Sequence, residues 1–183
     1  MGTIVSREDL EKKQIFLILV APANIRQRNI DLIKEISANG YHTIIVTINY
    51  PYNILLKLYA ENGVDPATVS FVDAVTRNSI GSAENIPGVV RFVNNPANLT
   101  DLGIAVTEVL KEHSGKKVCI LYDSVSTMLI YLSSQNISKF IHFVTNKLRL
   151  MDLSGVFLAV EKGLDPMLIS QLTTFVDTVI DTE

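Results

Sequence analysis

Four short apolar runs in this chain do not alternate between apolar and polar residues. Such runs, rich in β-branched residues, are typical of strands buried on both faces of a parallel sheet. The runs are IFLILV at 15–20, TIIVTI at 43–48, VCILY at 118–122 and GVFLAV at 155–160. Weaker runs at 70–75 and 178–180 predict outer strands, and 89–93 fits either a strand or a loop.

Helical patterns separate these runs, which predicts an α/β fold: a three-layer α/β/α domain with a mostly parallel sheet. The expected helices cover 25–39, 52–62, 98–113, 125–133, 137–153 and 167–176. The segment 76–88 is rich in Gly, Ser, Asn and Pro, which predicts a surface loop and a candidate for mobility. No linker or repeat divides the chain, so we expect a single domain over 1–183, with 1–14 as an N-terminal extension.

Composition excludes several classes of function. The formal net charge is −3 and the 16 Lys and Arg residues are scattered, so no nucleic-acid partner is expected. The one cysteine, Cys119, lies inside an apolar run and is expected to be a small buried hydrophobe. No apolar run reaches the roughly 18–20 residues of a membrane span, and the N-terminal REDLEKK does not resemble a signal peptide. We therefore expect a cytoplasmic protein without a membrane contact.

Ligands of open parallel sheets bind beyond the carboxyl ends of the strands. Asp123 and Ser124 follow the run at 118–122. An apolar strand that ends in a carboxylate is the Walker B pattern, in which the aspartate holds water on Mg²⁺. The same pattern also fits an aspartate that caps the following turn, and both interpretations stay open. Asp73 shares this sheet edge, but an intervening strand places it about 10 Å from Asp123, too far for one metal.

The three histidines, His42, His113 and His142, fall in different elements and are not expected to form a set. A Ser–His–Asp arrangement around Ser124 therefore has no support in the sequence.

Several segments together carry a resemblance to a known family. They are YHTIIVTINYP, SFVDAV, PANLTDLGIAVTEVL, VCILYDSVSTMLIYLS with SKFIHFVTNKL, and SGVFLAVEKGLDPMLISQLTTFVDTVID. Their order and spacing resemble the RecA superfamily, in its KaiC-like branch of archaeal RecA-type ATPases. The most specific parts are DSxSTxLxYxS and the closing FVDTVID. The resemblance implies a P-loop NTPase fold in which the 155–160 strand lies between 15–20 and 118–122, with 178–180 outside 15–20.

The chain departs from this family where ATP would bind. A working phosphate loop reads GxxxxGK[ST], whose glycines let backbone N–H groups surround phosphate and whose lysine reaches the β and γ phosphates. Aligned on that pattern, Ala21 and Arg26 stand at the two glycines, Gln27 at the lysine and Arg28 at the Ser/Thr. Pro22 also removes an N–H donor, and the residues that follow it all carry Cβ atoms, which disfavour left-handed turns.

A second departure is independent of the first. The resemblance implies a glutamate after the second strand as the base for the attacking water. Here the segment is INYPYN, and no carboxylate lies between Glu35 and Glu61. Neither Tyr50 nor Asn53 replaces that base. We therefore expect no catalytic residue, no metal unless Asp123 holds one, and no cofactor, with ATP–Mg²⁺ the only candidate.

The resemblance and its departures imply a non-catalytic pseudo-ATPase that acts as a regulatory or assembly module. Its partners would be a second copy, in a homo-oligomer, or a related RecA-like protein. The alternative is a weak nucleotide- or anion-binding protein. Its vestigial site would comprise Ala21, Pro22, Ala23, Asn24, Arg26, Gln27, Arg28, Asp123 and Ser124. In that alternative Arg26 and Arg28 hold an anion at a helix start; the competing interpretation has both facing water.

Two helical segments, MLIYLSSQ and FIHFVTNKL, are apolar over much of their circumference. The surplus apolar residues are Met128, Tyr131, Phe140 and Phe143. They predict either a subunit or partner contact or an unusually wide buried face.

Overall fold

A seven-stranded parallel sheet forms the centre of the computed structural model, which describes residues 2–182. The strand order is β4-β3-β2-β5-β6-β1-β7. The strands are β1 (Ile15–Val20), β2 (His42–Thr47), β3 (Val69–Asp73), β4 (Val90–Phe92), β5 (Val118–Asp123), β6 (Ser154–Val160) and β7 (Thr178–Thr182). All four apolar runs are strands, 89–93 contains β4, and the predicted positions of β6 and β7 beside β1 are confirmed.

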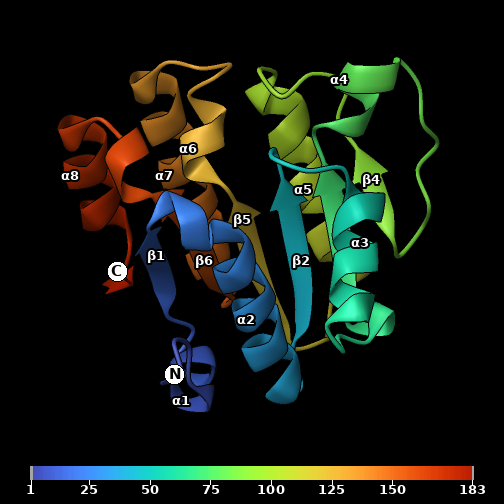
Figure 1. Cartoon of the computed structure of the whole chain (residues 1–183), viewed down its shortest axis with the longest axis horizontal. Coiled ribbons are helices and arrows are strands. Elements are labelled where there is room, and N and C mark those ends of the chain that lie inside the picture. Colours follow the sequence, from blue (N-terminus) through green and yellow to red (C-terminus); the bar gives the residue numbers. More distant parts are fainter. Residues whose placement is uncertain (1, 183) are drawn as a thin grey trace.

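Helices cover both faces of the sheet, which makes the fold a three-layer α/β/α arrangement (Figure 1). The helices are α1 (Arg7–Glu11), α2 (Ile25–Ala38), α3 (Tyr52–Glu61), α4 (Thr76–Ile80), α5 (Leu99–Glu112), α6 (Val125–Met128), α7 (Ser134–Leu150) and α8 (Pro166–Phe175). Short 3₁₀ turns are η1 (Pro22–Asn24), η2 (Pro66–Thr68) and η3 (Glu161–Gly163). Within residues 2–182, no helix combines the length and apolar character needed to cross a bilayer.

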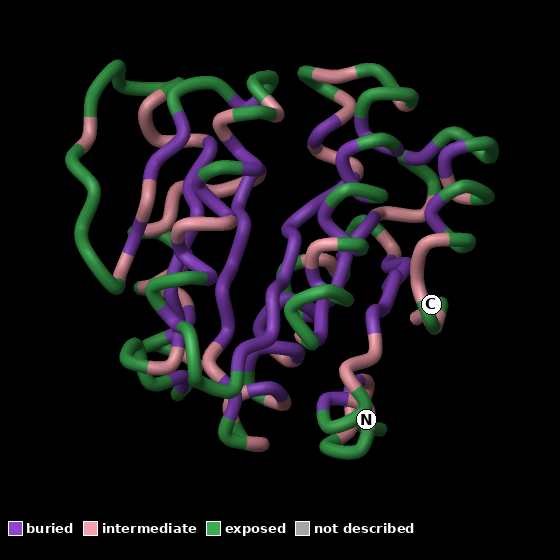
Figure 2. The backbone as a smooth tube through the Cα atoms, turned by 180° about the vertical axis from the view of Figure 1, so that it is seen from behind, coloured by how far each residue is buried: buried purple, intermediate pink, exposed green. Residues whose placement is uncertain are grey.

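The sheet separates two hydrophobic cores. Side chains of α2 and α3 pack on one face, and side chains of α5, α7 and α8 pack on the other. The four central strands are therefore buried along almost their whole length, as Figure 2 shows. Burial on both faces explains why their sequences do not alternate.

Local caps set most helix ends. The Asn98 side chain accepts from the Asp101 N–H and starts α5. Ser133 caps α7 in the same way, so this helix begins three residues before the predicted 137. The predicted loop 76–88 contains the short helix α4. The Arg77 side chain donates a hydrogen bond to the Ala83 carbonyl and so fixes the rest of this loop against α4.

The C-terminal strand is anchored through one aspartate. Asp177 accepts a hydrogen bond from the Ile15 N–H (2.8 Å) and pairs with Arg149 of α7 (3.1 Å). This carboxylate therefore joins the start of β1, the end of α7 and the start of β7, the edge strand. It belongs to the closing FVDTVID segment.

Candidate functional site

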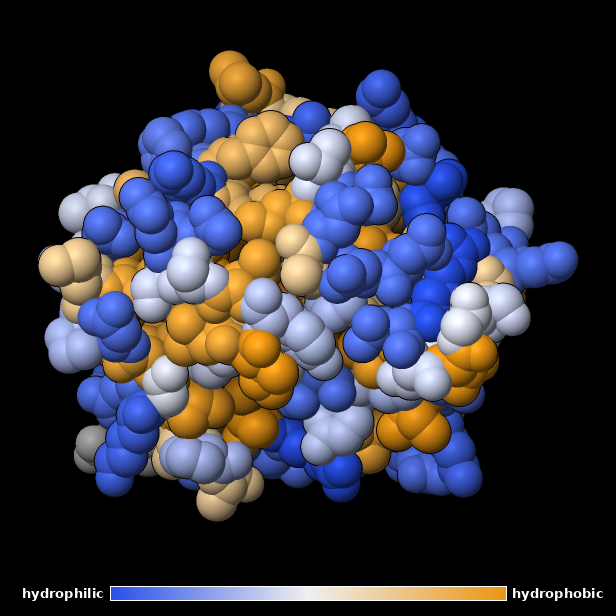
Figure 3. Space-filling view, turned by 90° about the horizontal axis from the view of Figure 1, so that it is seen from above, coloured by the Kyte–Doolittle hydropathy of each residue, from blue (hydrophilic) through white to orange (hydrophobic). Residues whose placement is uncertain are grey.

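The carboxyl ends of the strands, at the top of Figure 1, carry the residues that the sequence singles out. Figure 3 views the molecule from this side and shows hydrophobic side chains gathered on the half that carries α6 and α8. Large apolar side chains exposed there include Ile130 (72%), in the turn after α6, and Met167 (69%), on α8. An ATP site needs polar and charged groups here, and this half of the edge is instead largely apolar.

The loop after β1 does not form a phosphate cradle. Pro22–Asn24 form a single 3₁₀ turn, and the Asn24 N–H donates to the Ala21 carbonyl (2.9 Å). Helix α2 begins at the next residue, Ile25. One donor is thus used inside the turn and another is lost to proline, so the backbone offers no ring of free N–H groups.

Asp123 is held by a buried chain of hydrogen bonds that no local sequence pattern predicts. Its Oδ2 accepts from Nδ2 of Asn29 on α2 (2.8 Å), and Oδ1 of Asn29 accepts from the hydroxyl of Tyr59 on α3 (2.5 Å). All three side chains are buried. The one signal in the sequence is that Asn29 is an amide four residues before Ile33 on the apolar stripe of α2. A lone amide on such a stripe requires a buried partner.

Burial changes the chemistry of Asp123. Loss of solvent raises the pKa of Asp123 to about 6, and the hydrogen bond from Asn29 partly opposes this rise. Its Oδ1 atom has no hydrogen-bond partner among the described residues. Its environment therefore penalises the charged carboxylate that a Mg²⁺–water site needs.

The cavity beside Asp123 is very small. It measures about 10 Å³ and is lined by residues of α2, α3 and the loop after β2, including Arg26, Tyr50 and Leu55. A single water needs about 10–15 Å³, so no triphosphate fits. The Arg26 guanidinium lies over the Tyr50 ring, 5.5 Å from its centroid.

Arg26 and Arg28 do not come together. Arg26 is exposed beside Tyr50, whereas Arg28 is only 7% exposed and lines a different cavity with Gly2, Ile4 and Glu35. Residues two apart on a helix point in different directions, which explains the separation. The interpretation that both arginines face water is therefore wrong for Arg28. Gln27 is exposed and hydrogen-bonds Asp31 on the same helix.

Ser124 and Asp73, two further polar residues of this edge, bind backbone N–H groups. Ser124 caps α6 by accepting from the Thr127 N–H, so the cap is Ser124 rather than Asp123. The buried Asp73 accepts from three backbone N–H groups, those of Tyr52, Val75 and Thr76. Within the described residues, no group of His, Cys, Asp and Glu has the arrangement of a metal site.

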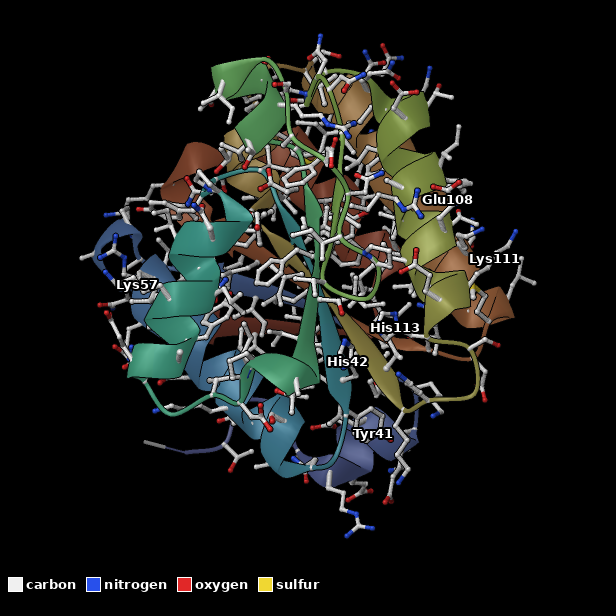
Figure 4. All side chains as sticks on the ribbon, turned by 90° about the vertical axis from the view of Figure 1, so that its right-hand side faces the viewer. Tyr41, His42, Lys57, Glu108, Lys111 and His113 are labelled. Atoms are coloured by element: carbon white, nitrogen blue, oxygen red, sulfur yellow. The ribbon has the colours of Figure 1, made fainter. Side chains whose placement is uncertain are left out.

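Two histidines meet at the opposite edge of the sheet, so the expectation that the histidines form no set is wrong for this pair. The rings of His42 and His113 stack with centroids 4.4 Å apart (Figure 4). Both approach the Ser70 hydroxyl, at 2.8 and 3.2 Å from their Nε2 atoms, and that hydroxyl donates to the Gly88 carbonyl. Burial, followed by the nearby His113 and Lys116, lowers the pKa of His42 to about 4. The pair joins β2, β3 and α5 far from Asp123, so it belongs to a different part of the molecule.

The surplus apolar residues of α6 and α7 divide between core and surface. Met128 and Phe140 are buried, whereas Tyr131 and Phe143 are 40% and 49% exposed. Cys119 is buried as expected, and burial raises the pKa of its thiol to about 12.

Comparison with known proteins identifies a family. Residues 26–182 match the family of unknown function DUF7504. The chain belongs to the DUF7504 family. This DUF7504 protein matches no curated protein. It is similar in fold to an uncharacterized protein from Pyrococcus horikoshii, described as in complex with an unknown peptide, at 16% identity and a TM-score of 0.72. That match covers 98% of this chain and 84% of the other.

Proposed function

We propose that this DUF7504 protein is a RecA-like, KaiC-like pseudo-ATPase that works as a non-catalytic regulatory or assembly module. One observation carries the proposal: Asp123, the candidate Walker B aspartate, is hydrogen-bonded to Asn29 beside a cavity of about 10 Å³. A Mg²⁺-binding aspartate has to face the phosphates and their water. Here α2, α3 and the loop after β2 occupy the space that such a ligand needs.

The residue types at this edge support the same proposal. The phosphate loop has no glycine, lysine or Ser/Thr at the motif positions, and its backbone forms a closed 3₁₀ turn. The segment after β2 supplies Tyr50, whose ring packs against Arg26, in place of a carboxylate. Loss of the phosphate cradle and of the base together leaves no route to activate water on ATP.

Binding of a polypeptide is the function we assign to the module. The Pyrococcus horikoshii protein of similar fold is described as bound to an unknown peptide. Apolar side chains exposed at the carboxyl edge and on α7 are of the kind used in protein contacts. The partner is a second copy, a related RecA-like protein or another polypeptide, and we place the module in the cytoplasm.

Thermal unfolding with ligands tests this function. We expect the Tm to stay unchanged with millimolar ATP–Mg²⁺, ADP or inorganic phosphate, because a ligand that binds only the folded state adds RT ln(1 + [L]/Kd) to stability. A rise in Tm that is lost in Arg26→Gln would contradict the proposal and establish the alternative, a weak nucleotide or anion binder. Arg7→Gln, on the exposed surface of α1, is the matched control for loss of one positive charge.

A further inference from the structure

An apolar groove runs between α5 and α7 on the helical face opposite α2. Its volume is about 660 Å³. Helix α5 lines it with Gly103, Ile104 and Thr107, and α7 lines it with Lys139, Phe140 and Phe143. Ile104 is 52% and Phe143 is 49% exposed, so both side chains are available to a partner. The groove is separate from the Asp123 region and contains no residue of the vestigial nucleotide site.

The fold explains why this space is open. Helix α5 packs over β2, β3 and β4, while α7 packs over β6, so a gap remains between the two helices above the buried strand β5. Tyr122 of β5 belongs to the core on this face, with its ring edge-on to Phe140 at 6.2 Å between centroids. Gly103 lets the Phe143 ring lie close to α5, because a Cβ there would lie 3.3 Å from a Phe143 ring carbon. The groove is therefore lined by the aromatic rings of Phe140 and Phe143.

The length of the groove suits a short helical partner. The lining residues of α5 run from Leu99 to Lys111. At 1.5 Å per residue this strip is about 18 Å long, or three helical turns. Amphipathic helices place their apolar face in such grooves through anchors at i, i+3 or i+4, and i+7.

The charged residues around the groove indicate which charge a partner should carry. Lys111 and Lys139 flank it, and neither forms an ion pair with any described residue. The one acidic lining residue, Glu108, is already paired with Arg91 at 2.7 Å (Figure 4 shows Glu108 and Lys111 on α5). The groove is thus positive on a chain whose net charge is −3. A second copy docked face to face would bring the lysines of both copies together, which disfavours that occupant.

We infer that the α5–α7 groove binds an amphipathic helix of a different protein, about three turns long, with aliphatic anchors and flanking Asp or Glu residues. This inference rests on the proposed function for its class of partner, a polypeptide. Binding at the groove does not depend on the state of the Asp123 region.

Selection from a display library of random 16-residue peptides on the whole chain tests the inference. We expect enrichment of peptides with aliphatic residues at i, i+3 or i+4, and i+7 and an excess of Asp and Glu. Synthetic copies should bind at least tenfold more weakly to Ile104→Ala and Phe143→Ala. The same selection on Lys111→Glu/Lys139→Glu should yield peptides without the excess of Asp and Glu. Ile54→Ala is the matched control, because Ile54 is 50% exposed on α3, on the other face of the sheet.

Three results would overturn the inference. They are no enrichment, enriched peptides without an acidic excess, and equal binding to the wild type and Phe143→Ala. Light scattering that shows a dimer dissociated by Phe143→Ala would make a second copy the occupant instead. Circular dichroism checks that each variant folds. Tm shifts with ATP–Mg²⁺, measured separately, report failure of the proposed function, so the two claims fail independently.

Discussion

Asn29 links three elements through a single side chain. Its amide nitrogen donates to Asp123 of β5 and its oxygen accepts from Tyr59 of α3, while the residue itself sits on α2. Tyr59→Phe would leave the buried Asn29 oxygen without a donor. Because a buried unsatisfied acceptor costs about 1–3 kcal/mol, we expect the free energy of unfolding to fall by about that amount in urea titrations.

Tyr131→Phe is the control for that substitution. Tyr131 is 40% exposed and its hydroxyl makes no hydrogen bond to a described residue, so its removal should change stability little. Equal losses in Tyr59→Phe and Tyr131→Phe would contradict the role given to the Asn29 link.

His42 predicts a specific dependence of stability on pH. Its pKa is about 4 in the folded chain against 6.5 as a free side chain, because of burial and of the neighbouring His113 and Lys116. Between these values the unfolded state binds a proton that the folded state does not. Stability is therefore complete above pH 6.5 and is lost as the pH falls toward 4.

Replacing His42 with Gln should remove this component of the pH dependence. Urea unfolding at pH 7.5 and pH 4.5 should show a smaller loss of stability on acidification in His42→Gln than in the wild type. His142→Gln, at an exposed position on α7, should behave as the wild type does. An identical acid loss in all three proteins would be inconsistent with a depressed His42 pKa.

The role of a polar residue could be predicted when its hydrogen-bond partner lies nearby in the sequence. Ser133 and Asn98 act on N–H groups three residues ahead, and such caps have local signatures. Asp123 is bound by Asn29, 94 residues earlier, and no local pattern encodes that pairing. The sequence therefore predicts Asp123 as a candidate site residue but does not predict its contact with Asn29.

At the scale of elements, the Asp73 carboxylate joins β3 to α3 and α4. Its carboxylate accepts from the Tyr52 N–H, from Val75 and Thr76 N–H groups, and from the Thr76 hydroxyl. Asp73→Ala would leave these donors without their acceptor. We expect a loss of more than about 3 kcal/mol in the free energy of unfolding, since each buried unpaired group costs about 1–3 kcal/mol.

Asp65 offers a matched comparison. It caps the short turn η2 through one exposed hydrogen bond to the Ala67 N–H. Loss of such a cap costs about 0.5–2 kcal/mol, so Asp65→Ala should be clearly less damaging than Asp73→Ala. Denaturant titration compares the two variants, and equal losses would refute a structural role for Asp73 in joining several elements.

Element types were predictable where burial or capping is strong. The four central strands have continuous apolar sequences because both faces are covered, and all four predictions are confirmed. The short elements were harder. Strand β4 has three residues and α4 has five, lengths at which propensity carries little information. Strand β4 is held by its pairing with β3, and the loop after α4 is held by the bond from Arg77 to Ala83.

At the scale of the whole molecule, the positions of β6 and β7 beside β1 agree with those that the family resemblance implies. The close packing around Asp123 was not predictable in detail. It results from α2, α3 and the loop after β2 meeting around Asp123, and no single segment contains that information. The α5–α7 groove arises similarly, because two helices separated in sequence pack over different strands and leave a gap between them.

We infer that Asp123 is a core residue rather than a metal ligand, and Asp123→Asn tests this most directly. The folded pKa of Asp123 is about 6, above the ordinary 3.8. The folded state therefore holds the proton more tightly than the unfolded state does. This contribution to stability is present below pH 3.8 and is lost as the pH rises through 6. An asparagine still accepts from Asn29 and carries no charge. We expect Asp123→Asn to raise the free energy of unfolding by about 1–2 kcal/mol at pH 8, with the gain gone by pH 4.

The decisive measurement is therefore the unfolding free energy of the wild type and Asp123→Asn at pH 8, each with and without millimolar ATP–Mg²⁺. We expect a variant that is more stable than the wild type and no effect of ATP–Mg²⁺ on either protein. Stabilisation of the wild type but not of the variant by ATP–Mg²⁺ would contradict this expectation and assign Asp123 to a working nucleotide site.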